Sequence, residues 1–143
     1  MTTKNNPWNY QGKIFEPTDE ELKPYAGFVY EITNLSTFRK YIGKKFFWKT
    51  IKMPPLKGKK RKRLKTTQSD WPKYWGSSNE LLADIEEIGI DKFSRSVIRL
   101  CNSKTECAYY ELKEQMDRDV LLTHSYYNGF VGGKINGRNL LKE

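Results

Sequence analysis

The sequence predicts a single α+β domain in which helices pack on a small antiparallel sheet. Its length of 143 residues fits one domain with a modest core. Runs rich in β-branched and aromatic residues alternate with runs whose apolar residues recur at helical spacing. Their order along the chain is strand, strand, helix, strand, helix, which favours a sheet with helices packed on it.

The first two strands are expected to form an antiparallel hairpin. The run FVYEIT at 28–33 is rich in strand-forming residues and ends at the turn former Asn34. The run FRKYIG at 38–43 then resumes strand character. Tyr30 and Tyr41 lie on the two arms, so the hairpin would bring their side chains toward each other.

Two helices and a third strand follow. Ser77 and Glu80 form a capping box at the start of an apolar stripe that ends at Gly89, which predicts the first helix. The run at 92–100 returns to strand character. A second capping box predicts a helix over 103–117.

The chain is expected to divide into a leader and one folded domain. Residues 1–25 are polar and rich in proline, and Thr18 with Glu21 predicts one short helix in this leader, which would pack loosely or wrap around the domain. Residues 26–143 would form the domain. Within it, residues 49–70 are interpreted as a long inserted loop, because PPL interrupts regular structure.

The inserted loop is strongly basic. Seven of the nine residues in KGKKRKRLK carry positive charge: Lys57, Lys59, Lys60, Arg61, Lys62, Arg63 and Lys65. Such a dense run repels itself unless it meets phosphate, so these residues are candidates for binding DNA. A solvated loop without a specific role and a nuclear import signal are alternative interpretations.

The net charge of +9 favours a polyanionic partner. Nucleic acid is the first candidate. An anionic membrane is the second, but the basic run lacks an amphipathic helical pattern. No apolar stretch is long enough for a membrane span or a signal sequence, and two cysteines are too few for a disulfide scaffold, so we expect a cytoplasmic protein with no membrane partner.

One carboxylate lies on the apolar side of the last predicted helix. A step of 100° per residue places Glu111 in the same stripe as Cys107, Leu112 and Gln115. A buried carboxylate must be paired, protonated or bound to a metal. An ion pair with one of the 26 basic side chains and a Mg²⁺ ligand both satisfy this requirement.

These residues together resemble the GIY-YIG nuclease family. Phe28, Val29 and Tyr30 stand at the GIY position, and residues 41–43 read YIG. The run YWGSSNELLADIEEIGIDKF resembles the helix and strand entry of phage-type members, and YYNG places Asn128 where these nucleases have an asparagine. The resemblance covers roughly residues 26–130.

The resemblance implies a central three-stranded antiparallel sheet and hydrolysis of phosphodiester bonds in double-stranded DNA. It implies a divalent cation, Mg²⁺ or Mn²⁺, on Glu111. Tyr30 would position or deprotonate the attacking water, with a nearby lysine lowering its pKa. Tyr41 would bind phosphate or water, and Asn128 would hold the local loop.

The sequence departs from the family at one position. The family has an arginine on a helix shortly after the YIG glycine, but Ile51 stands there. The candidates for the missing cation are Lys44, Lys45, Arg61, Arg63 and Arg39. Proximity to the hairpin favours Lys44 or Lys45.

We therefore expect a stand-alone DNA endonuclease of the phage or homing type. With no separate DNA-targeting domain expected, specificity would come from the insertion, the leader, a homodimer or a partner. One alternative is a noncatalytic nucleic-acid-binding protein that keeps the fold, which the absent arginine makes plausible. The other is an RNA-directed enzyme or an accessory protein that docks through the basic loop.

Overall fold

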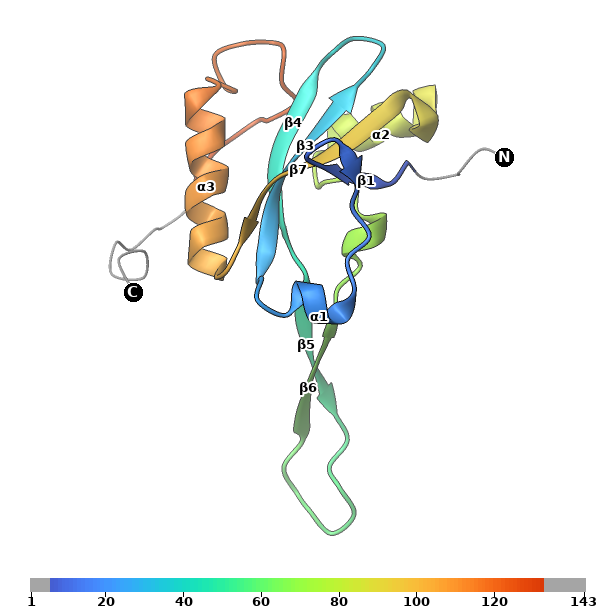
Figure 1. The fold of residues 1–143 in the computed structure, drawn as a ribbon, viewed down its shortest axis with the longest axis vertical. Coiled ribbons are helices and arrows are strands. Elements are labelled where there is room, and N and C mark those ends of the chain that lie inside the picture. The colour runs from blue at the N-terminus through green and yellow to red at the C-terminus, as the bar shows by residue number, and fades with distance from the viewer. Residues whose placement is uncertain (1–5, 133–143) are drawn as a thin grey trace.

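The computed structural model describes residues 6–132. Its body is an α+β unit with a five-stranded sheet at its centre, and a two-stranded hairpin projects from it (Figure 1). The strand order in the large sheet is β2-β1-β7-β3-β4. The predicted α+β class is confirmed, and none of the helices in this described part of the chain could cross a bilayer.

Three of the five strands form the antiparallel sheet that the sequence predicted. β3 (Gly27–Asn34) pairs with β4 (Lys40–Phe46) on one side and with β7 (Phe93–Cys101) on the other, antiparallel in both cases. A β-bulge interrupts the β3–β7 register between Val29 and Tyr30. The hairpin predicted for the two tyrosines is thus present, and β4 is an edge strand of the sheet.

The prediction that the sheet has only three strands is wrong, because the N-terminal segment extends it. β1 (Trp8–Tyr10) pairs parallel to β7, and β2 (Lys13–Ile14) pairs antiparallel to β1. Trp8 holds this segment in place: its side chain is only 2% exposed, and its indole N–H donates to the Trp71 carbonyl at 2.8 Å. Two strands this short carry too little pattern to be recognised in a polar stretch.

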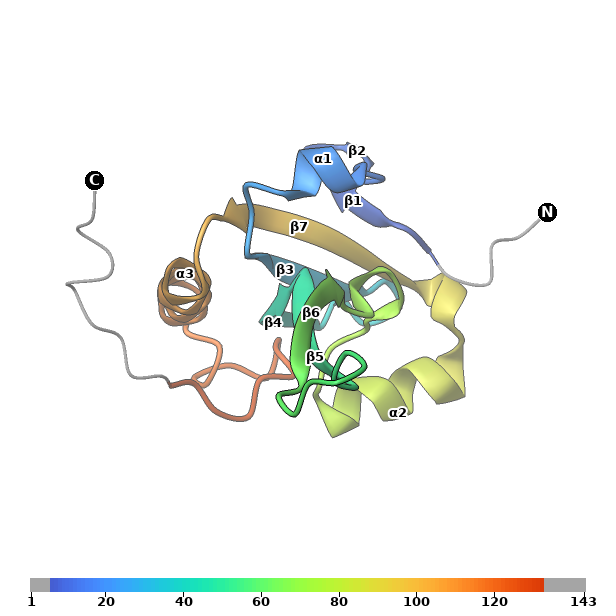
Figure 2. The same cartoon turned by 90° about the horizontal axis from the view of Figure 1, so that it is seen from below.

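Helices lie on both sides of the sheet (Figure 2). The predicted last helix is α3 (Lys104–Asp117), and it covers the face that carries Val29 and Ile42. α2 (Asn79–Ile88) covers the opposite face, where the aromatic core gathers, and the 3₁₀ turns Trp71–Lys73 and Ile90–Lys92 flank it. The cap of α2 is Ser78 and not the predicted Ser77.

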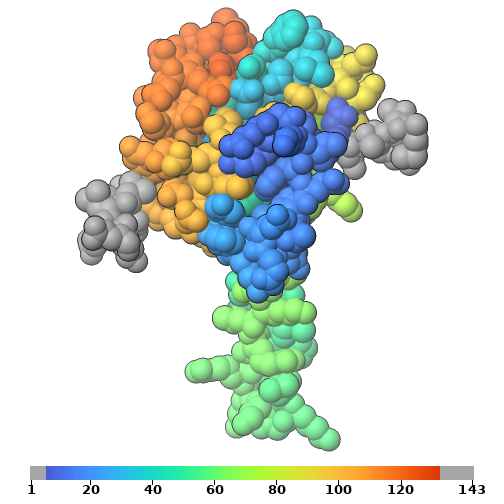
Figure 3. All heavy atoms as spheres, in the orientation of Figure 1, coloured from blue at the N-terminus to red at the C-terminus, as the bar shows by residue number. Residues whose placement is uncertain are grey.

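The segment predicted as a long basic loop is mostly a β-hairpin. β5 (Trp48–Met53) pairs antiparallel with β6 (Arg63–Gln68), so only residues 54–62 form a loop. The prediction of irregular structure across 49–70 is wrong for both flanks. Both faces of this hairpin are largely exposed, so no apolar alternation marks its strands in the sequence. Figure 3 shows this hairpin extending well beyond the body. The short helix α1 (Asp19–Leu22), with its predicted Thr18–Glu21 capping box, lies at the hairpin's root.

We predict that replacing Trp8 lowers the stability of the domain, because this indole is part of the core. Its ring packs edge-on against Phe28 at 4.9 Å. Trp8→Ala should lower the free energy of unfolding by about 3–5 kcal/mol, measured by urea denaturation. Ile14→Ala in the adjoining strand is the control, since Ile14 is 59% exposed and should change stability by less than about 0.5 kcal/mol. Equal effects of the two substitutions would show that β1 is not part of the core.

Candidate active site

A cavity of about 780 Å³ opens where β4, α3, the start of α2 and the chain at 128–132 meet. All six residues proposed for catalysis from the sequence line it: Tyr30, Tyr41, Lys44, Lys45, Glu111 and Asn128. Their individual roles stay predictions. The structure nevertheless brings groups from four separate segments of the chain to one place.

The cavity wraps around the edge of the sheet. Tyr30 pairs across β3 and β4 with Gly43, so Tyr30, Tyr41 and Lys45 share one face. Lys44 lies on the other face, toward α3, where it meets Glu111. Because β4 has no neighbouring strand on its outer side, groups from both faces reach the same space.

Glycine at position 43 is a steric requirement of the site. A Cβ atom there would lie 2.5 Å from the Tyr30 hydroxyl oxygen and 3.0 Å from the Tyr41 ring. The absent side chain lets the phenol of Tyr30 lie across β4. The two tyrosine rings are consequently neighbours, with centroids 6.1 Å apart.

Both tyrosines are held in their neutral form. Burial is the main reason that the pKa of Tyr30 is raised well above 10, and the nearby Tyr41, Tyr74 and Glu111 raise it further. Burial also raises the pKa of Tyr41, although a hydrogen bond to the Ser77 hydroxyl at 3.2 Å opposes this. The prediction that a lysine lowers the pKa of Tyr30 is therefore wrong for this arrangement.

The two lysines nearest the tyrosines are engaged with other groups. Lys44 Nζ lies 3.1 Å from Glu111 Oε1. Lys45 Nζ lies 2.7 Å from Asp70 Oδ1 and 4.1 Å from the centre of the Tyr74 ring. The positive charge of each lysine is thus directed to a carboxylate and not to the Tyr30 phenol.

Glu111 is the one carboxylate that reaches the cavity from α3. Its side chain is 14% exposed, and its ion pair with Lys44 realises one of the two interpretations made from the sequence. The chemistry of the site also fits a divalent cation. Within residues 6–132 no three His, Cys, Asp or Glu side chains cluster as ligands, so a cation would depend on Glu111 together with oxygens of water and substrate, which Mg²⁺ accepts.

Asn128 attaches the C-terminal wall of the cavity to β4. Its side-chain oxygen accepts from the Ile42 N–H at 3.1 Å, and its amide nitrogen donates to the Ile42 carbonyl at 2.8 Å. Gln115 donates to the same carbonyl at 3.0 Å, and the Tyr127 N–H donates to the Lys40 carbonyl at 2.7 Å. The outer edge of β4 is therefore satisfied by side chains and a loop instead of another strand.

Sequence reasoning missed a buried cation behind the cavity wall. The guanidinium of Arg95 lies against Trp8 and Trp75, and it donates to the Pro72 and Tyr74 carbonyls. Burial lowers the pKa of Arg95 to about 10. The sequence did contain a sign of this burial. Successive strand residues face opposite sides of the sheet, so Arg95 faces the same side as the buried residues 93 and 97.

The other predicted cations lie outside the cavity. Arg61 and Arg63 are on the projecting hairpin. The position of the family's arginine, Ile51, is on the same hairpin. Arg39 pairs with Glu80 at 2.8 Å. Of the residues that the structure describes, those lining the cavity include three lysines but no arginine.

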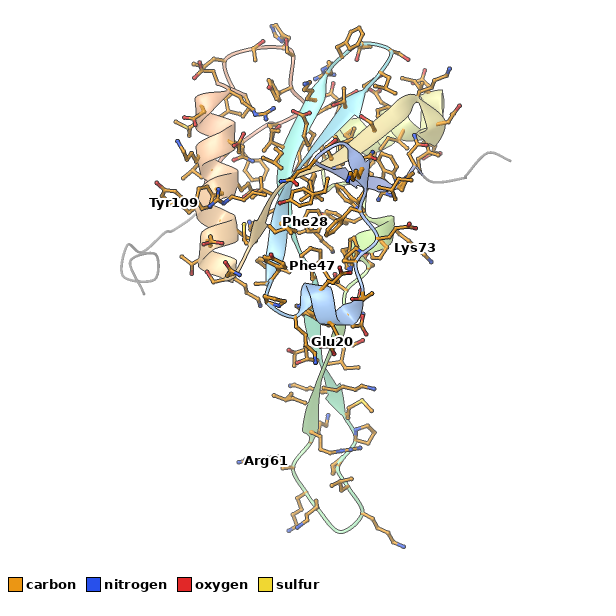
Figure 4. All side chains as sticks on the ribbon, in the orientation of Figure 1. Glu20, Phe28, Phe47, Arg61, Lys73 and Tyr109 are labelled. Carbon is orange, nitrogen blue, oxygen red and sulfur yellow. The ribbon has the colours of Figure 1, made fainter. Side chains whose placement is uncertain are left out.

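The seven basic residues proposed to bind DNA are on the hairpin, at or near its tip. They are exposed, and none of them lines the cavity. Figure 4 shows Arg61 near the far end of the hairpin, well away from Glu20 at the root. A direct role of these residues in the chemistry of the cavity is thus not supported by their position.

A cavity that combines phenols, ammonium groups and carboxylates is suited to hold a phosphate diester together with a cation. A family model described as "Putative endonuclease segE, GIY-YIG domain" matches residues 8–131, and the chain therefore belongs to this family of GIY-YIG endonuclease domains. The resemblance drawn from the sequence is confirmed, and the match extends into the N-terminal segment that forms β1. No curated protein and no solved structure matches the chain.

We predict that Tyr30 ionises later than an ordinary tyrosine. Its pKa is raised, so the unfolded chain loses this proton first, and the stability contributed by the neutral phenol is lost as pH rises above 10. Ultraviolet titration of the folded protein should show a late phenolate step that Tyr30→Phe removes. Exposed Tyr109 supplies the control, since Tyr109→Phe should leave that step in place. A late step of equal size in both variants would contradict the assignment.

Proposed function

We propose that this domain is a metal-dependent endonuclease that hydrolyses phosphodiester bonds in double-stranded DNA. The observation that carries the proposal is the convergence of two neutral tyrosines, two lysines and Glu111 on one cavity at the edge of β4. The family supports a nuclease acting on nucleic acid. The basic hairpin favours a long polyanion over a small phosphate ester.

Glu111 is the residue that would hold the cation, Mg²⁺ or Mn²⁺. When bound, the cation would neutralise the negative charge that develops on the phosphate during hydrolysis. Lys44 and Lys45 would supply positive charge in the cavity in place of the family's arginine. As point charges they can bind phosphate without the fixed geometry that a guanidinium imposes.

The tyrosines act as hydrogen-bond donors in this proposal. A neutral phenol can donate to a phosphate oxygen or orient a water, whereas it cannot accept a proton as a base. Ser77 fixes the direction of the Tyr41 hydroxyl, and Gly43 leaves room for that of Tyr30. Asn128 acts as a positioning residue, because it bonds to the backbone of Ile42 next to both tyrosine-bearing positions.

A noncatalytic nucleic-acid-binding protein is the second candidate, since no arginine is among the residues described around the cavity. Nicking of supercoiled plasmid separates the two candidates, and cleavage of duplex RNA beside duplex DNA tests the choice of substrate. Because the described residues form one such site, cutting both strands would need a homodimer or two successive nicks. A stand-alone enzyme of a phage or mobile element is the setting that we infer.

We predict that Glu111→Gln abolishes metal-dependent nicking while DNA binding remains, because the amide keeps the shape but loses the charge. Plasmid nicking with and without Mg²⁺ measures the first effect, and binding in EDTA measures the second. Glu114→Gln is the matched control: it lies on the same helix, pairs with Arg118 and does not line the cavity. Full nicking by the Glu111 variant would refute the proposed metal ligand.

The tip of the hairpin, which comprises the loop 54–62 and the first residue of β6, should provide phosphate contacts. Replacing five of its exposed cations by alanine should reduce the steepness with which DNA affinity falls as salt increases. The five are Lys59, Lys60, Arg61, Lys62 and Arg63. Binding titrations at several salt concentrations measure this slope, and an unchanged slope would show that the tip does not touch DNA.

A further inference from the structure

The β5–β6 hairpin has two unequal faces. In an antiparallel pair, residues directly opposite each other point to the same side, and the sides alternate along the strands. The register therefore separates the side chains into two sets. The first set, here called the cavity face, is Lys49, Ile51, Met53, Arg63, Lys65 and Thr67. The second, here called the α1 face, is Trp48, Thr50, Lys52, Leu64, Thr66 and Gln68.

The charge of the hairpin lies mainly on the cavity face. This face carries three cations, Lys49, Arg63 and Lys65, whereas the α1 face carries only Lys52. Arg63 is held in place by a hydrogen bond from its Nε to the Pro54 carbonyl at 3.2 Å. Two apolar side chains, Ile51 and Met53, lie between these cations.

The α1 face is attached at its root to an acidic helix. The Trp48 indole N–H donates to the Tyr25 carbonyl at 3.0 Å, and the Gln68 amide donates to Asp19. The first turn of α1 also carries Glu20 and Glu21. Negative charge at this place repels a phosphate backbone, so the α1 face is unsuited to DNA.

The cavity face leads into the active-site cavity instead. Lys49 lines that cavity, and so do Ser69 and Asp70, which directly follow β6; of the α1 face, only Trp48 at the root reaches it. Viewed along the hairpin in Figure 2, α1 and the C-terminal part of the described chain lie on opposite sides of it. DNA with a phosphate in the cavity would therefore meet the cavity face and leave the α1 face in solvent.

We propose that the cavity face of the β5–β6 hairpin enters the DNA major groove beside the cleaved phosphate and selects the sequence there. This inference rests on the proposed function, because it takes DNA as the substrate. A two-stranded β-ribbon fits the major groove of B-DNA. Arg63 and Lys65 can donate to the N7 and O6 acceptors of guanine, and Ile51 and Met53 can contact thymine methyl groups.

The attachment at the root gives the readout a fixed register. Six-residue strands span roughly 20 Å, which corresponds to about six base pairs along the groove at 3.4 Å each. The Trp48 and Gln68 contacts hold the hairpin at one angle to the body. The bases contacted by the hairpin would therefore lie at a set distance from the cut.

Two lysines on opposite faces provide a matched test. Lys52→Ala and Lys65→Ala each remove one exposed lysine from neighbouring positions of the same hairpin. Binding to a pool of short random-sequence duplexes is measured by fluorescence anisotropy in EDTA at several salt concentrations. Lys65→Ala should weaken binding several-fold at each salt concentration without changing the salt slope, because a contact to a base neutralises no phosphate, while Lys52→Ala should change neither. Equal effects would overturn the proposal, and thermal unfolding establishes that both variants keep their fold.

A second measurement tests the groove. Replacing guanine by 7-deazaguanine in the duplex pool removes the N7 acceptor from the major groove only. This change should weaken binding by the wild-type protein and should reduce the difference between wild type and Lys65→Ala. Undiminished binding to the modified pool would place the hairpin on the phosphate backbone and overturn sequence readout by this face.

Plasmid nicking by the wild-type protein distinguishes failure of this inference from failure of the proposed function. If the wild-type protein nicks plasmid and the two lysine variants bind DNA equally, the inference is refuted and the enzyme assignment stands. Unequal lysine effects without any nicking refute the enzyme assignment and support the hairpin as a DNA-reading element.

Discussion

The close approach of the Tyr30 phenol to the backbone of Gly43 is the constraint on which the site depends. Any side chain at position 43 would occupy the space of the Tyr30 hydroxyl. This contact places two phenols side by side at the edge of the sheet, and it also buries Tyr30 deeply enough to keep it protonated. The same packing that assembles the site therefore favours the neutral phenol, the form in which Tyr30 is proposed to donate hydrogen bonds.

A site at a sheet edge creates a second problem, because an edge strand exposes unpaired backbone groups. The chain solves it with side chains. Asn128 bonds to both backbone groups of Ile42, Gln115 adds a second donor to the carbonyl, and the Tyr127 N–H bonds to Lys40. These bonds protect the edge without filling the space beside it, so Glu111 and Lys44 can approach from the α3 side while the tyrosines approach from the other.

The sequence allowed the central features of the fold and site to be predicted, because they depend on local patterns. Tyr30 and Tyr41 are in strands with clear β character, and the helical stripe located Glu111 correctly on the inner side of α3. Other features depend on distant contacts that no local pattern reveals. β1 is stable because Trp8 packs on Phe28, and the pKa of Tyr30 depends on burial by groups from several segments. The β5–β6 pairing gave no such pattern, because both faces of the hairpin are largely exposed and its apolar residues do not alternate with polar ones.

The proposed chemistry and the proposed recognition are assigned to two parts of the chain that need different physical environments. The phenols and Glu111 require a partly buried cavity, where hydrogen bonds and charges act strongly because water is limited. The cations of the hairpin lie exposed, as the proposed contacts to an extended DNA surface would require. Trp48 and Gln68 connect the two parts by fixing the root of the hairpin to the body beside α1. A change at this root would leave both sets of residues intact and alter only their relative placement. Under the proposal, the distance between the contacted bases and the cleaved phosphate would therefore depend on these two contacts.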